Sequence, residues 1–146
     1  MPAHSPTLRD CLLAYYDFRR RISSAVHNDA LTCFQRVSAR QPHVAQVWSG
    51  LAMLYIEDYA ATFGRGGDSI LESARAATDQ ALAIDADDFL ANLALTRMQF
   101  FDGDAAFSET IDRALKLRPD SSEIVPKTTR SSEAPRSTSS LTCSVQ

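Results

Sequence analysis

The chain has 146 residues, of which 45% are hydrophobic and 23% charged, and its formal net charge is −3. These values fit one globular domain with its own core, and a net negative chain has no long-range positive field to attract nucleic acid or an anionic membrane surface. No apolar run approaches the roughly 20 residues needed to cross a bilayer. We therefore expect a soluble protein with neither nucleic acid nor membrane as a partner.

Apolar residues recur at three- and four-residue spacing along most of the chain, which predicts helices rather than strands. Residues 1–6 form an N-terminal extension, and Ser5, Pro6 and Thr7 are a suitable helix start. In chain order, the expected helices cover residues 7–23, 28–40, 44–58, 69–84, 87–101 and 104–117.

Three helical segments end alike. They are DALTCFQRVSARQPH (29–43), ARAATDQALAIDADD (74–88) and FSETIDRALKLRPDS (107–121). When these segments are aligned, Pro42, Ala86 and Pro119 fall at the same position, 44 and 33 residues apart. The spacing indicates a repeat of about 34 residues whose first interval is about ten residues longer. YAATFGRGGDS (59–69) supplies the extra length as a turn, whose glycines precede a helix N-cap.

The helix in the middle of the chain carries Trp48, Leu51, Ala52 and Tyr55 on one face, at a spacing that resembles the first-helix signature of the tetratricopeptide repeat (TPR). The second helix of that family carries a small, an aromatic, a small and a proline residue. This order is matched by Ala30, Phe34, Val37 and Pro42, and more weakly by Ala74, Thr78, Ala81 and Ala86 and by Phe107, Ile111, Ala114 and Pro119.

The resemblance implies an all-α fold for residues 7–124, as a right-handed superhelical stack of about three TPR-like helical hairpins, or α-solenoid. Trp48 should then pack between its own second helix and the neighbouring hairpins rather than serve a cofactor. Residues 125–146 are a Ser/Thr-rich tail, which we expect to be disordered. The array lacks a closing helix, which indicates truncation or self-association (a homo-oligomer) through the uncapped C-terminal repeat.

Cys11, Cys33 and Cys143 are an odd number of cysteines without the short spacing of a zinc site. The count also does not fit the disulfide framework of a small secreted domain. We expect a cytoplasmic protein in which Cys11 and Cys33 are free thiols that behave as small buried hydrophobes.

Two short motifs resemble known ligand-binding motifs, but each lacks residues that its motif requires. GRGGDS (64–69) has neither the lysine of a phosphate-binding Walker A loop nor the strand before it. DADD (85–88) lacks the closing glutamate of a calcium loop, so we expect Asp87 and Asp88 to cap the next helix. Residues 102–104 (DGD) are expected to form a turn.

The sequence brings together no acid, base, nucleophile or metal-ligand set, so we expect no enzyme, cofactor or metal site. His4, His27 and His43 lie in different loops or helix ends. Arg19, Arg20 and Arg21 point around a helix, and we expect a solvated basic run.

The resemblance implies a protein–protein interaction module that binds a partner protein or peptide on its concave face, formed mostly by the first helix of each hairpin. The family's register projects five residues onto this wall, namely Ser49, Met53, Asn92, Thr96 and Gln99. The basic and asparagine residues of the family's carboxylate-clamp subset are absent from most of these positions, so binding of chaperone tails is not expected.

A second hypothesis is a shortened regulatory segment of a bacterial signalling protein. The lengthened loop and the ALAIDADD stop at 81–88 resemble the helical arrays attached to adenylate cyclases and winged-helix transcriptional regulators. An adjacent catalytic or DNA-binding domain in the same reading frame would favour this hypothesis.

Overall fold

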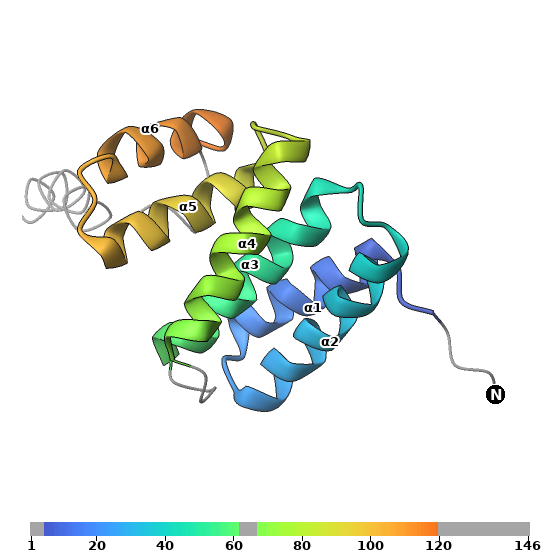
Figure 1. The fold of residues 1–146 in the computed structure, drawn as a ribbon. Helices are drawn as coiled ribbons and strands as arrows, with labels where there is room; N and C mark the ends of the chain where they lie inside the picture. Colours follow the sequence, from blue (N-terminus) through green and yellow to red (C-terminus); the bar gives the residue numbers. More distant parts are fainter. Residues whose placement is uncertain (1–4, 62–66, 120–146) are drawn as a thin grey trace, which may run out of the picture.

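The computed structural model describes residues 5–61 and 67–119, and in these ranges the chain is all α-helical (Figure 1). The helices are α1 (Leu8–Arg20), α2 (Ser24–Arg40), α3 (Ala45–Ala61), α4 (Asp68–Ile84), α5 (Phe89–Asp102) and α6 (Phe107–Leu117). The predicted all-α class is therefore confirmed. The expected tail at 125–146 and residues 64–66 of the glycine-rich motif lie outside the described ranges.

Side-chain caps set the first two helix starts. The Thr7 hydroxyl accepts from the Asp10 amide at 3.1 Å, and the Asp10 carboxylate accepts from the Thr7 amide at 2.9 Å. Ser23 accepts from the Val26 amide at 3.2 Å, so α2 begins at residue 24, four residues earlier than predicted. Each cap satisfies an amide that the first helical turn leaves without a partner.

The caps of α4 and α5 differ from each other. Asp88 accepts from the Ala91 amide at 2.9 Å, as predicted for the start of α5. Gly103 ends α5 with φ 68°, a left-handed conformation that glycine adopts without steric cost. At the start of α4, however, the capping position is Gly67, with φ 56° and no side-chain cap. The sequence predicted that a polar side chain after the glycines would cap α4, and this prediction is wrong.

The helices pack as three consecutive hairpins: α1 with α2, α3 with α4, and α5 with α6. The first helix of each later hairpin also packs on both helices of the hairpin before it, so α3 contacts α1 and α2, and α5 contacts α3 and α4. In the described part of the chain, no other pair of helix backbones approaches closely. Helix α3 consequently lies at the centre of the molecule (Figure 1).

Trp48 packs against the core from a half-buried position on α3. Its indole nitrogen donates to the Pro42 carbonyl at 2.8 Å, which joins the first turn of α3 to the loop before it. The apolar part of the ring contacts both groups of core residues. The indole therefore contributes to helix packing, although it is only partly buried, and its place between repeats stays a prediction.

Gly50 marks the close approach of α2 to α3. A Cβ atom built on Gly50 would lie 2.3 Å from the ring of Phe34, which is itself fully buried. No side chain fits at that distance, so α2 reaches its observed position only because residue 50 has none.

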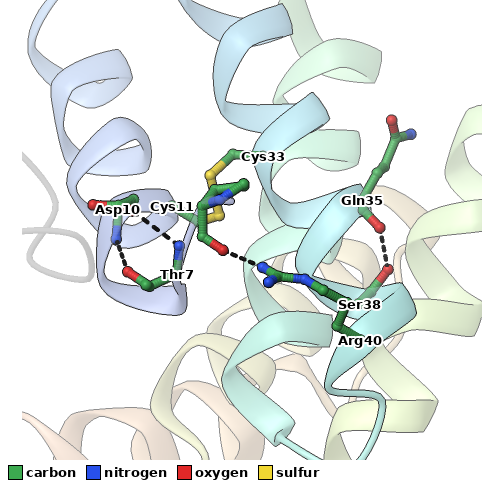
Figure 2. Close-up of a disulfide and its surroundings, with 8 residues drawn as sticks. Thr7, Asp10, Cys11, Cys33, Gln35, Ser38 and Arg40 are labelled. Atoms are coloured by element: carbon green, nitrogen blue, oxygen red, sulfur yellow. Dashed lines mark hydrogen bonds between the residues drawn. A yellow bond between two sulfur atoms is a disulfide. The ribbon is translucent and has the colours of Figure 1, made fainter. Parts of the chain in front are cut away.

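Cys11 of α1 and Cys33 of α2 form a disulfide, with their Cα atoms 5.4 Å apart (Figure 2). The expectation of two free thiols is wrong, because the hairpin brings together cysteines whose separation of 22 residues matches no short motif. The pairing also removes the cysteine count as an argument for a reducing, cytoplasmic setting. Beside the disulfide, the Arg40 guanidinium donates to the Pro6 carbonyl, which ties the segment before α1 to the end of α2 (Figure 2).

Candidate functional site

Four of the five residues projected onto an open wall are buried. Ser49, Met53, Asn92 and Thr96 are at most 3% exposed, and Gln99 is partly exposed. Their predicted accessibility is wrong, because α3 and α5 are covered by neighbouring helices on more sides than the repeat register alone indicates. Whether these residues contribute to partner binding stays a prediction.

The polar groups among these four residues bond within their own helix or its first turn. Asn92 donates to the carbonyls of Ala86 and Asp88 at 2.9 and 2.8 Å. The Thr96 hydroxyl donates to the Asn92 carbonyl at 2.8 Å. Because buried polar groups must be paired, these bonds let α5 bury polar side chains without a ligand. Asn92 thus holds the turn before α5.

Charged side chains from three helices meet at Glu57. Arg19 of α1 and Arg97 of α5 each donate through Nη1 to the same oxygen, Glu57 Oε2, at 2.8 and 2.5 Å. The Glu57 side chain on α3 is 12% exposed, while those of Arg19 and Arg97 are 30% and 29% exposed. The carboxylate is therefore enclosed, and the two guanidinium groups reach solvent.

A pocket of about 470 Å³ lies at this cluster, and we call it the Glu57 pocket. It is lined by residues of α1, α3, α5 and α6, namely Arg19, Glu57, Thr96, Arg97, Phe100, Phe101, Phe107 and Ile111. Of the residues that the sequence projected onto the wall, Thr96 alone belongs to this lining.

Aromatic rings form the other part of the pocket. Phe100 is 64% exposed and Phe101 36% exposed, and these are among the large apolar side chains left on the surface. The Phe100 ring lies 5.5 Å from that of Phe107, and the Phe101 ring lies 5.4 Å from that of Tyr59, measured between centroids. Exposed apolar surface of this kind is typical of sites that bind another molecule.

The charges of the pocket do not cancel. Two guanidinium groups share one carboxylate, which leaves a formal excess of one positive charge in a chain whose total is −3. Each guanidinium carries five N–H donors, and the pairing with Glu57 uses one nitrogen of each. The arrangement can therefore accept a carboxylate beside an apolar group.

The basic run on α1 divides into two parts. Arg20 and Arg21 are exposed and pair with Asp17 at 3.3 and 2.6 Å, as a solvated run would. The hydrogen bond from Arg21 holds the pKa of Asp17 below its ordinary value. Arg19 instead turns inward to Glu57, so the prediction of a solvated run is wrong for this residue. Arg19 and Arg97 lie 38 and 40 residues from Glu57 in the sequence, so local spacing gives no sign that they pair with it.

The DADD segment is occupied by local bonds. Asp85 accepts from the Asp87 amide at 2.9 Å, Asp87 pairs with Arg113 at 3.0 Å, and Asp88 caps α5. Within residues 5–61 and 67–119, no three His, Cys, Asp or Glu side chains are arranged to hold a metal ion. In the same ranges, no helix combines the length and the apolar character that a membrane span requires.

His27 is a structural residue that the sequence did not single out. It lies in the first turn of α2, at a helix end as expected, and is 1% exposed. Its Nε2 lies 2.7 Å from the Leu54 carbonyl oxygen of α3, and because a carbonyl only accepts, the histidine nitrogen is the donor. The bond joins the first two hairpins through the interior.

Comparison of the chain with protein-family models, with curated proteins and with solved structures finds no match.

Proposed function

We propose that this protein is a TPR-like interaction module that binds a segment of a partner protein in the Glu57 pocket. Two observations support the repeat architecture. Trp48, Leu51, Ala52 and Tyr55 carry the first-helix spacing of the family, and each later hairpin packs its first helix on both helices of the hairpin before it. Repetition of such contacts generates a right-handed superhelical stack with a concave inner wall.

The observation that carries the function is the convergence of paired arginines and exposed phenylalanines in one pocket. The first helices α1, α3 and α5 contribute Arg19, Glu57 and Arg97, and the end of α5 contributes Phe100 and Phe101. First helices form the inner wall of such stacks, which is where they hold peptides. A purely structural ion pair would not require adjacent exposed rings.

The occupant that fits this chemistry is a peptide segment with a carboxylate next to an aliphatic or aromatic side chain. The carboxylate would accept charge-assisted hydrogen bonds from Arg19 and Arg97. The apolar side chain would cover the Phe100 ring, which is mostly exposed. Because the positive charge is local and partly exposed, the affinity should fall as salt rises.

The test is selection of binders from a random-peptide display library on the purified chain, followed by titration of the selected peptides. We expect selected peptides to combine an acidic with an apolar residue. Phe100→Ala and Arg97→Gln should each weaken their binding by about tenfold, the usual loss at a central interface residue. Leu13→Ala is the matched control, because Leu13 is 60% exposed and does not line the pocket.

Two results would refute the proposal. One is a selection that enriches no acidic and apolar motif. The other is equal binding of the selected peptides by the wild type, Phe100→Ala and Arg97→Gln, with all three shown to be folded by circular dichroism.

A further inference from the structure

The disulfide closes the first hairpin at its open end. Cys11 lies near the start of α1 and Cys33 lies within α2, while residues 21–23 join the other ends of these helices. Helix α1 is thus held to α2 by covalent bonds at both of its ends. No other two helices in the described ranges are joined by a disulfide.

Helix α1 needs that link more than the inner helices do. It is the first of the helices in residues 5–61 and 67–119, and among these its backbone packs closely only on α2 and α3. Its anchors in the core are Cys11, Tyr15 and Phe18, and its outer face leaves Leu13 60% exposed. A terminal element with one covered side opens locally at a lower free energy than a central one. What holds α1 in place therefore decides how often it opens.

The position of α1 also determines whether the Glu57 pocket is complete. Arg19 lies in the last turn of α1 and is the residue of α1 that lines the pocket. If α1 opens, the carboxylate of Glu57 loses one of its two guanidinium partners and the pocket loses one side.

The two cysteine residues differ in exposure, which favours one direction of exchange. Cys33 is partly exposed, whereas Cys11 is fully buried. An external thiolate can attack the Cys33 sulfur, form a mixed disulfide there and release Cys11 as a thiolate, which takes up a proton. A second external thiolate then attacks the external sulfur, which releases the Cys33 thiol and one external disulfide. The reverse reaction uses a disulfide such as oxidised glutathione as the oxidant.

We propose that the Cys11–Cys33 disulfide is an exchangeable clasp that regulates the Glu57 pocket. In the oxidised chain the clasp holds α1 on α2 and α3, so that Arg19 completes the pocket. In the reduced chain α1 separates from α2 and α3 along its whole length, including its last turn, so the pocket loses its Arg19 wall. Control of peptide binding rests on the proposed function, whereas the exchange and the opening of α1 do not.

The experiment uses the full chain with Cys143→Ser, so that Cys11 and Cys33 are the only thiols. The protein is equilibrated with oxidised or reduced glutathione, alkylated and weighed by mass spectrometry, and amide hydrogen exchange is measured for each helix. We expect no alkylation after oxidation and two alkylated thiols after reduction. Reduction should speed exchange in α1 by roughly tenfold and leave α3 unchanged, because loss of a loop-closing bond releases the terminal helix.

The double variant Cys11→Ala with Cys33→Ala keeps small apolar side chains and should reproduce the reduced state. Alkylation of both thiols after oxidation, or equal α1 exchange in both states, would overturn the proposal. Opening of α1 with unchanged peptide affinity would overturn the link between clasp and pocket. Absence of peptide binding in both states, together with redox-dependent α1 exchange, would refute the proposed function and leave the clasp in place.

Discussion

Helices α3 and α6 show how position in a stack of hairpins sets the pattern of a sequence. Helix α3 contacts α1, α2, α4 and α5 and buries 11 of its 17 residues, so it is apolar around most of its circumference. Within residues 5–61 and 67–119, the only helix that packs closely on α6 is α5, and Ala114 is its one buried residue, so its apolar residues form one stripe. A helix that is apolar on every side belongs at the centre, and a two-faced helix belongs at an edge.

The same difference explains why the projected wall residues are buried. The family register treats every first helix as half open, which holds in a long array. In this short chain, neighbouring helices cover α3 so fully that Ser49 and Met53 have no accessible side chain. The pocket instead lies towards the ends of α3 and α5, where Glu57 and Phe100 line it.

The largest effect is expected when one leucine in α3 and one leucine in α6 are each replaced by alanine. Leu54→Ala in α3 should cost about 3 kcal/mol of unfolding free energy, because Leu54 is fully buried and its loss leaves a cavity. Leu115→Ala in α6 should cost about 1 kcal/mol, since Leu115 is only partly buried. Urea denaturation followed by circular dichroism measures both. Equal losses would contradict the distinction between centre and edge.

A smaller effect is expected where α2 meets α3. Gly50→Ala should lower the free energy of unfolding by about 1 to 2 kcal/mol, because the new methyl group overlaps the Phe34 ring. This value is a net loss. Alanine has a helix propensity about 1 kcal/mol more favourable than that of glycine, and this gain offsets part of the cost of the overlap. Adding Phe34→Leu should make the double variant more stable than the sum of the two losses predicts. If the losses of the two single variants simply add in the double variant, the new methyl group does not overlap the Phe34 ring.

The smallest effect concerns the exposed end of α1. The hydrogen bond from Arg21 lowers the pKa of Asp17 from its ordinary value of 3.8. A carboxyl whose pKa is lower in the folded state adds stability above its unfolded pKa of about 3.9 and loses it as pH falls through the folded value. Thermal melts of the wild type and Asp17→Asn should therefore differ slightly at pH 7 and converge at the acidic end. A difference that is constant with pH would contradict this assignment.

The helices could be predicted from sequence because their signals are local. Apolar spacing located all six, and the cap at Asp88 and the turn at Gly103 follow from residues within a few positions. The start of α2 was missed because the Ser23 cap precedes a weakly apolar first turn.

The site could not be predicted in the same way, because its contacts join residues distant in the chain. Glu57 has no basic residue within a helical turn that marks it as an ion-pair partner, and Arg19 and Arg97 lie on two other helices. The pairing of Cys11 with Cys33 likewise depends on the depth and register of the first hairpin. Side-chain spacing records which face a residue occupies but not how far the neighbouring helices extend over that face.

The single tryptophan gives the protein an internal optical reporter. Trp48 is the only indole in the chain, and its ring contacts residues of α3, α4 and α5 while its nitrogen donates to the Pro42 carbonyl. Fluorescence excited selectively at tryptophan therefore originates at the junction of the second and third hairpins. Emission recorded during unfolding follows the middle of the molecule and is insensitive to fraying at either terminus, so the two kinds of motion are spectroscopically separable without a label.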